Sequence, residues 1–314
     1  MPTEGARPFR FAVQASRAGS ARAWRDLAAK IEDLGYSTLY VPDHLDDQWG
    51  PLVALTVAAE ATSTLRVGSL VLDNDYRHPV VLAKELATLD LVSEGRLEAG
   101  LGAGWMKTDY EQSGIALDPP GTRVERLAEA VTVMKALWSE GTVTFSGRHY
   151  TVTAARGWPR PHRPGGPPLV IGGGSRRVLS LAATEADVVG INPSLAAGQV
   201  GPEVAASSLA ERFAERVAWV REAAGERFSE LELQCLTFAA SIVPDGREMR
   251  AALAPSFGIT ADEAAEVPIV LVGSEAEVTE ALHARRERYG LSYWVVHEDA
   301  VESFAPVVGR LAGR

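Results

Sequence analysis

The segment RVGSLVLDNDYRHPVVLAKELATLDLVSEGRLEAGLGAGW, residues 66–105, decides the fold because it contains a complete strand, helix and strand unit. Its first part, Val67–Leu72, is a run of apolar and small residues, which is typical of a parallel strand buried on both faces. Pro79 suits the first position of a helix, and His78 before it is expected to cap that helix. Gly95 ends the helix, and a short second strand follows it. Two strands joined by a helix predict a right-handed parallel crossover.

The second strand, Leu97–Leu101, runs into a series of glycines at 100, 102 and 104. These glycines leave the carboxyl end of the strand with little side-chain bulk, so a flat ligand can approach the backbone there. The GxGxG triplet is neither a P-loop nor the dinucleotide-binding fingerprint with its acidic residue. The segment therefore predicts a glycine-lined cavity at a strand end, which is where barrel enzymes carry out their chemistry.

Strand and helix patterns alternate through the rest of the chain. In the first half the strands begin about every 30 residues, which is the length of one βα unit. We expect strands at 9–15, 38–42, 67–72, 97–101, 168–172, 187–191, 231–242 and 292–297. Eight strands alternating with helices in 314 residues predict one α/β domain over residues 1–314, a (β/α)₈ TIM barrel.

Two irregular segments interrupt the alternation, after the fourth and the seventh βα units. The first, 141–167, is rich in Gly, Pro, Arg and His and contains one expected hairpin near 143–152. The second, 244–267, precedes another short apolar run at 268–272. We interpret both segments as insertions over the carboxyl-terminal mouth of the barrel.

Composition is that of an ordinary globular enzyme, with 46% hydrophobic and 23% charged residues. The net charge of −10 and the absence of a Lys/Arg cluster in the sequence argue against nucleic acid or an anionic membrane as a partner. No apolar stretch has transmembrane length, and the first residues lack a secretory pattern. The single Cys235 fits a buried position and cannot form an internal disulfide, which suits a reducing compartment. We therefore expect a cytoplasmic protein. The spacing of Cys and His residues does not indicate a metal site.

Several polar and aromatic residues follow expected strand ends. His44, which follows Asp43, suits proton transfer because an imidazole titrates near neutrality. In the alternative interpretation, Asp43 caps the next turn and His44 forms a hydrogen bond within the barrel wall. Gly172–Ser175 leads into a helix that starts with two arginines, a pattern that either binds phosphate or forms a simple turn with solvated arginines. Four aromatic residues either line a substrate pocket or pack in loops: Trp49, Trp105, Tyr110 and Trp158.

The sequence resembles the luciferase-like superfamily of barrel oxidoreductases, and within it the branch that uses the deazaflavin coenzyme F420. Within this branch, the run Leu72–Pro79 resembles an actinobacterial subgroup of F420-dependent oxidoreductases. The matching segments follow one another in barrel order: Val41–His44, Arg77–Pro79 with Thr88–Asp90 and Ser93–Arg96, Gly100–Trp105 and Ile171–Gly174.

This resemblance implies a bound F420 and a set of residues that contact it. His44 is the implied catalytic acid or base, and a non-proline cis peptide is implied between Ser69 and Leu70, beside the ring. The loop at Gly173 is implied to hold the coenzyme phosphate, and relatives imply a homodimer. The implied cofactor-binding residues are Asp43, Ser69, Leu70, Val71, Gly102, Gly104, Gly172, Gly173, Gly174, Ser175 and Arg176.

The implied reaction is hydride transfer between F420 and a small organic substrate. Trp105 stands where the F420-dependent sugar-phosphate dehydrogenases carry a glutamate, so an activated C=C or C=N bond is a more plausible target than a sugar phosphate. Two alternatives remain open at this stage. One is an FMN-dependent luciferase-like monooxygenase, and the other is a non-catalytic barrel that binds a ligand or a subunit.

Overall fold

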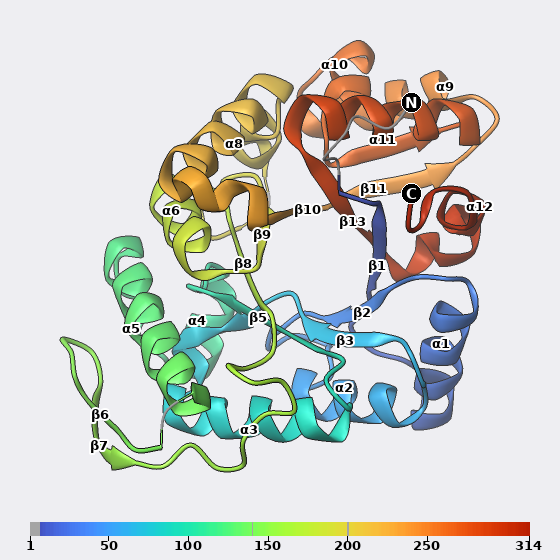
Figure 1. Cartoon of the computed structure of the whole chain (residues 1–314). Helices are drawn as coiled ribbons and strands as arrows, with labels where there is room; N and C mark the ends of the chain where they lie inside the picture. Colours follow the sequence, from blue (N-terminus) through green and yellow to red (C-terminus); the bar gives the residue numbers. More distant parts are fainter. Residues whose placement is uncertain (1–6, 140, 200) are drawn as a thin grey trace.

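The computed structural model describes residues 7–139, 141–199 and 201–314, and it is a closed parallel barrel wrapped by helices (Figure 1). The first strand pairs with both the second and the last, and the third pairs with the fourth barrel strand, so the sheet closes on itself. This confirms the predicted α/β class and the TIM barrel. The barrel strands are β1 (Arg10–Gln14), β2 (Thr38–Val41), β3 (Arg66–Ser69) continued by β4 (Leu72–Asp73), β5 (Leu97–Gly102), β8 (Leu169–Gly173), β9 (Val188–Ile191), β10 (Glu232–Leu236) and β13 (Leu291–His297).

Helices surround the barrel and bury their apolar faces against the outer faces of the strands. Trp24, Leu86 and Phe304 are among the fully buried side chains of this core. Within the described ranges, none of the helices combines the length and the apolar character that crossing a bilayer requires. The surrounding helices are α1 (Ala21–Asp33), α2 (Pro51–Glu60), α3 (Pro79–Val92), α5 (Pro120–Ser139), α6 (Arg176–Glu185), α8 (Ala210–Ala224), α11 (Glu275–Tyr289) and α12 (Val301–Leu311).

The ends of α3 are set by the residues that the sequence singled out. The His78 side chain accepts a hydrogen bond from the Val80 backbone N–H at 3.3 Å, and Pro79 is the first helical residue. Gly95, just beyond the helix, has a φ of +80°, a conformation that favours glycine. The predicted cap and stop are both confirmed, and they fix the crossover that carries the chain from β3 to β5.

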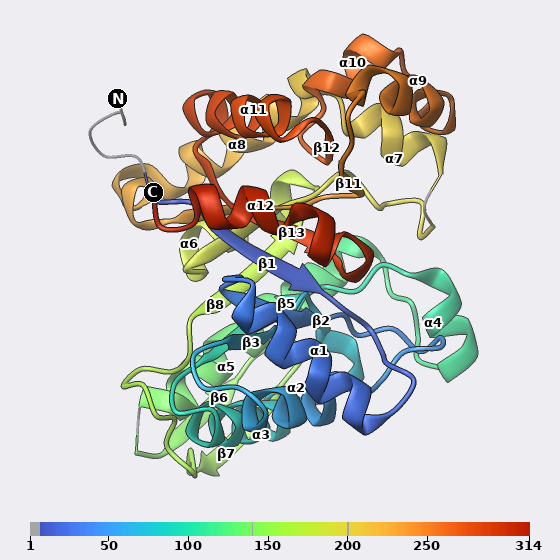
Figure 2. The ribbon, with the colours of Figure 1, turned by 90° about the vertical axis from the view of Figure 1, so that its right-hand side faces the viewer.

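The first expected insertion lies beside the barrel and not over its mouth. Its hairpin, β6 (Val143–Ser146) and β7 (Thr151–Ala155), is held by the Glu129 side chain of α5, which accepts backbone hydrogen bonds from residues 148–150. Figure 2 shows the hairpin on the side away from α4 (Lys107–Ser113) and α7 (Pro202–Ser207), which stand at the mouth. The expected position is corrected because α5 runs away from the mouth, so a segment that follows α5 begins at the opposite end.

The second expected insertion does lie near the mouth, as α9 (Gly246–Phe257) and α10 (Ala261–Glu266). The strand expected at 231–242 is divided in two: β10 stays in the barrel, and β11 (Ala239–Ile242) leaves it. β11 pairs in parallel with β12 (Val270–Gly273) in a sheet of their own. The chain changes sheet where the Thr237 N–H still bonds Val295 of β13 and the Phe238 N–H bonds Ile269.

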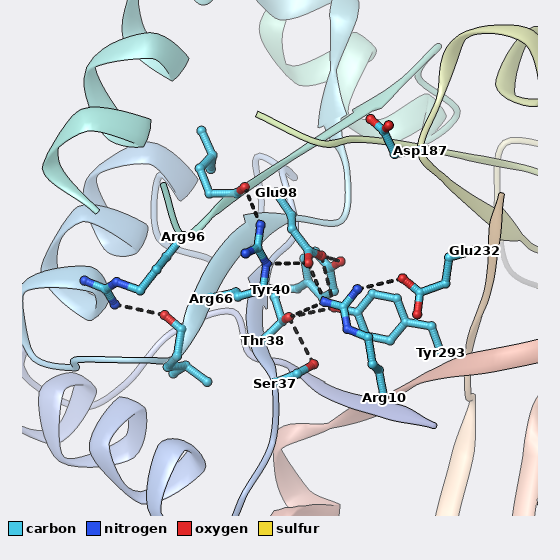
Figure 3. A network of polar contacts seen from close by, with 12 residues as sticks. Arg10, Ser37, Thr38, Tyr40, Arg66, Arg96, Glu98, Asp187, Glu232 and Tyr293 are labelled. Carbon is cyan, nitrogen blue, oxygen red and sulfur yellow. Dashed lines mark hydrogen bonds and ion pairs between the residues drawn. The ribbon is translucent and has the colours of Figure 1, made fainter. Parts of the chain in front are cut away.

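The opposite end of the barrel interior is filled by a network of charged and hydroxyl side chains (Figure 3). Glu98 of β5 is buried at its centre, and Arg66 Nε donates to it at 2.7 Å. Arg10 bridges Glu98 and Glu232, while the hydroxyls of Tyr40 and Tyr293 also donate to Glu98. Burial alone would raise the pKa of Glu98, but the two arginines outweigh burial and hold that pKa below its ordinary value. This end of the barrel is thus closed by paired charges, and the open end is the mouth.

Candidate functional site

A cavity of about 580 Å³ opens at the carboxyl ends of the barrel strands. This volume is in the range of pockets that bind small molecules and cofactors, and the position is that of TIM-barrel active sites. The cavity brings together segments from the whole length of the chain. Its predicted lining residues are Asp43, His44, Leu70, Val71, Gly102, Gly104, Trp105, Gly172, Gly173, Gly174 and Ser175.

His44 is held in the cavity wall by a carboxylate that sequence reasoning did not identify. Its Nδ1 lies 2.8 Å from Oδ2 of Asp109, a residue of α4 that is 2% exposed. The Leu45 backbone N–H and the Tyr76 hydroxyl also donate to that carboxylate, at 3.3 and 3.2 Å. Because a carboxylate accepts and cannot donate, Nδ1 carries a proton, and Nε2 is the nitrogen left to accept or deliver one. Trp105 packs its ring edge-to-face with the imidazole, at 5.5 Å between centroids.

Asp43 forms an ion pair and thereby fixes the chain between β3 and α3. Its carboxylate accepts two hydrogen bonds from the Arg77 guanidinium, at 2.5 and 3.0 Å, and one from the Asp73 backbone N–H at 3.0 Å. Asp43 also lines the cavity, so it can both brace the wall and contact a ligand.

Asp73 is a second titratable group in the cavity wall. Burial raises its pKa from the ordinary 3.8 to about 6, and the nearby charges of Asp75 and Asp43 add to this effect. Hydrogen bonds from the Asp75 N–H and the Tyr110 hydroxyl act in the opposite direction. Asp73 therefore changes charge close to neutral pH, on the same cavity as His44.

The glycine-rich loop after β8 leads directly into the amino terminus of α6. Ser175 caps this helix by accepting a hydrogen bond from the Val178 N–H, and it also lines the cavity. The first amides of a helix have no partner within the helix and favour anions. A Cβ on Gly174 would lie 2.2 Å from the Pro193 carbonyl oxygen, so glycine is needed there for the loop to pass the segment after β9. The loop and helix fit a phosphate-bearing cofactor at this end of the cavity.

Some residues predicted to contact the ligand lie elsewhere. Ser69 points into the barrel wall, where its hydroxyl donates to the Gly100 carbonyl at 2.9 Å, and it does not line the cavity. Arg176 is on the exposed face of α6 and pairs with Glu222. The cis peptide joins Leu70 to Val71, one bond later than expected. The stretch between the cis peptide and Arg77–Pro79 is thus one residue shorter than the family resemblance implies.

Only Trp105 of the four aromatic candidates lines the cavity. Trp49 packs against Trp24, with 5.6 Å between ring centroids. Tyr110 is buried, and its hydroxyl donates to Asp73 and Asp75, so it supports the wall from behind. Trp158 lies outside the cavity beyond the β6–β7 hairpin and is 62% exposed.

The cavity is also lined by Gln14, Arg123 and His297, which the sequence analysis did not predict as site residues. Gln14 of β1 donates from its side-chain amide to the Leu70 carbonyl at 2.9 Å, and Arg123 of α5 donates to the Ala103 carbonyl at 3.0 Å. His297 ends β13, and burial lowers its pKa. The sequence signal that could have identified His297 is its position at the end of the strand expected at 292–297. Among the described residues, no group of three or more His, Cys, Asp or Glu side chains is arranged to hold a metal ion.

The fold and the cavity together define an α/β barrel whose mouth holds a histidine bonded to a buried carboxylate and the capped start of a helix. The model of the luciferase-like monooxygenase family matches residues 6–292, so the chain belongs to that family. This confirms the superfamily that the sequence motifs indicated.

The relatives with named activities include a dehydrogenase and a monooxygenase. The chain is 32% identical over 170 residues to the F420-dependent glucose-6-phosphate dehydrogenase of Kineococcus radiotolerans, covering 52% of this chain and 50% of the relative. It is 35% identical over 155 residues to the 4-hydroxyprotoasukamycin monooxygenase of Streptomyces nodosus subsp. asukaensis, covering 47% and 41%. The chain spans no more than 64% of the length of the curated relatives that it matches first.

A solved structure shows the same fold over nearly the whole chain. The coenzyme F420 dependent tetrahydromethanopterin reductase from Methanopyrus kandleri superposes with a TM-score of 0.78 and 19% identity, covering 97% of this chain and 99% of that one. At this identity the likeness concerns the fold alone.

Proposed function

We propose that the protein is an F420-dependent oxidoreductase that exchanges hydride with a small organic substrate. The observation that carries the proposal is a single cavity bounded by the Asp109-held His44 at one wall and the Ser175-capped start of α6 at another. The F420-dependent glucose-6-phosphate dehydrogenases among the sequence matches support the deazaflavin over other cofactors. The single buried Cys235 is consistent with a cytoplasmic location.

The residues of the chain have distinct roles in this proposal. The first amides of α6 bind the cofactor phosphate, while the Leu70–Val71 backbone and the glycines at 102 and 104 leave room for the flat ring. When bound, a deazaflavin supplies or accepts the hydride. His44 moves the matching proton through Nε2, because Asp109 fixes Nδ1 as the donor. Asp73 is a second group that can hold a proton in the same wall.

Trp105 restricts the substrate. The indole of Trp105 packs edge-to-face against His44, so on this side of the imidazole the cavity presents an aromatic ring and not a carboxylic acid. A sugar phosphate would place hydroxyls against this ring without partners, which is costly. We therefore propose a less polar substrate with an activated C=C or C=N bond.

The first experiment measures which cofactor binds. Purified protein is titrated separately with F420 and with FMN, and binding is followed by fluorescence. We expect micromolar affinity for F420. Binding of FMN alone would overturn the proposal in favour of a luciferase-like monooxygenase, which the monooxygenase relative supports as the second candidate. Binding of neither cofactor would favour a non-catalytic barrel.

A second experiment locates the phosphate. Ser175→Asp keeps a good helix cap but adds a negative charge at the start of α6, and Ser175→Asn keeps the cap without charge. We expect the aspartate to weaken F420 binding about ten-fold relative to the asparagine, because it repels the phosphate. Equal affinities of the two variants would show that the phosphate binds elsewhere. Gly173→Asp is a poorer choice, since a Cβ there would lie 2.4 Å from Val178 Cγ1.

The catalytic role of His44 is tested by His44→Ala. We expect turnover to fall about 100-fold or more, while F420 affinity changes by less than about three-fold, because the imidazole acts on the proton and not on the phosphate. Turnover equal to that of the native protein would remove His44 from the reaction.

A further inference from the structure

A second cavity, of about 550 Å³, adjoins the first, and the proposed reaction leaves it without a role. We call it the outer chamber. It lies between the strand β11, the helix α9 and the 3-10 turn η3 (Glu298–Ala300). The two cavities have five lining residues in common, so a ligand can extend from one into the other: Gln14, Pro42, Gln48, Phe238 and His297.

One wall of the outer chamber is apolar. It is formed by the second insertion and by the two-stranded sheet of β11 and β12. Phe238 and Ala240 contribute from the β10–β11 connection and β11, Met249 and Leu253 from α9, and Val272 from β12. Met249 is 36% exposed and Leu253 is half-buried, so this wall continues to the protein surface. An apolar group would gain contact area here without displacing a paired polar atom.

The facing wall is acidic. Glu298 and Asp299 line it from η3, next to Ser16 after β1. Among the described residues that line the chamber there is no lysine and no arginine. Glu298 accepts one hydrogen bond from the Ser16 backbone N–H, and Arg17, the cation that acts on Glu298, pairs with Asp47 at 2.8 Å. The carboxylates are therefore left to act on whatever enters the chamber.

Gln48 adds a hydrogen-bond acceptor at the junction of the two cavities. Its Oε1 is buried and has no hydrogen-bond partner among the described residues. A buried carbonyl oxygen without a partner is costly, and a ligand N–H would satisfy it. Gln48, Glu298 and Asp299 therefore favour a ligand that donates hydrogen bonds and carries positive charge.

We propose that the outer chamber binds the amine-bearing, apolar part of the substrate while the reacting bond lies in the cofactor cavity. The inference rests on the proposed function for the position of the reacting bond, but the chamber's preference for an apolar amine is independent of the cofactor. An apolar amine would satisfy the Gln48 acceptor and the two carboxylates and cover Phe238 and Leu253.

The test uses three probes of the same shape: phenylbutylamine, phenylbutanol and phenylbutyrate. Binding to the native protein is measured by calorimetry without cofactor and again with F420. We expect the amine to bind about five-fold tighter than the alcohol and the butyrate to bind weakest, as the contribution of partly exposed ion pairs suggests. The double variant Glu298→Gln, Asp299→Asn should remove the preference for the amine and leave the affinity for the alcohol unchanged.

A filling variant locates the probes. Leu253→Trp should abolish binding of both amine and alcohol, and Met249→Trp, at the exposed rim, is the second filling variant if the first is unstable. Affinity for F420 should be the same with and without saturating amine. Equal binding of the amine and the butyrate, or amine binding that neither filling variant weakens, would overturn the inference. Failure of F420 to bind would overturn the proposed function alone, because the probe results do not depend on it.

Discussion

Replacing Asp109 by asparagine tests whether the carboxylate sets the protonation of His44. The contact is a hydrogen bond of 2.8 Å between Nδ1 and Oδ2, and a hydrogen bond to a charged group contributes about 1.5–3 kcal/mol. If that energy is available only when His44 develops charge during proton transfer, kcat/KM falls about 10- to 150-fold. The Leu45 N–H holds the new amide oxygen at the place of Oδ1, so the amide NH₂ faces Nδ1.

Two measurements follow this variant. Nitrogen NMR of the imidazole should show a proton on Nδ1 in the native protein and on Nε2 in Asp109→Asn, and turnover with F420 should fall while F420 affinity stays within about three-fold. Asp46→Asn, an exposed aspartate two residues beyond His44, is the matched control and should change neither quantity. An unchanged NMR signature together with native turnover would refute the positioning role of Asp109.

Three further predictions concern stability and assembly. Glu98→Gln leaves Arg10 and Arg66 without their shared carboxylate and should lower the free energy of unfolding by about 3–5 kcal/mol at pH 7; because the folded pKa of Glu98 is depressed, this loss should shrink in urea titrations as the pH falls below about 4. The pKa of Asp73 is raised to about 6, so its contribution to the free energy of unfolding should fall by about 2 kcal/mol as pH rises from 4 to 7, and Asp73→Asn should flatten that part of the curve; a variant curve with the native slope would contradict the assignment. The adjacent helices α2 and α3 carry two exposed valines, Val53 with 74% and Val81 with 54% of the residue surface accessible, and such a surface suits the expected homodimer. The double variant Val53→Asp, Val81→Asp should therefore halve the molecular mass measured by light scattering. A monomeric native protein would contradict this prediction.

The barrel could be predicted from the sequence because its determinants are local. The apolar run at 67–72, the His78 cap and the Gly95 stop each depend on neighbours along the chain; the cap and the stop are found as predicted, and the run forms β3 and β4 with a break at residues 70–71. The glycine loop at 172–174 could likewise be placed at the mouth, since the carboxyl ends of parallel strands lie at one end of a barrel.

The contents of the cavity could be predicted only in part because they depend on contacts between distant segments. Asp109 reaches His44 through the short helix α4, and no spacing in the sequence relates two residues 65 positions apart. Ser69 is the last residue of β3 and bonds within the wall, whereas Leu70 and Val71 lie in the break between β3 and β4 and line the cavity. The hairpin after α5 lies beside the barrel and not over its mouth, because its position depends on the direction of α5 and on Glu129, not on its own composition.

The division of the chain between the barrel and the separate sheet of β11 and β12 has a consequence for engineering. β11 and β12 form hydrogen-bonded ladders with each other, outside the closed ring. Residues 238–273 can therefore be lengthened, shortened or exchanged without removing a strand from the closed ring. Because this segment also supplies the apolar wall of the outer chamber, it is the first region to randomise in a library aimed at new ligands.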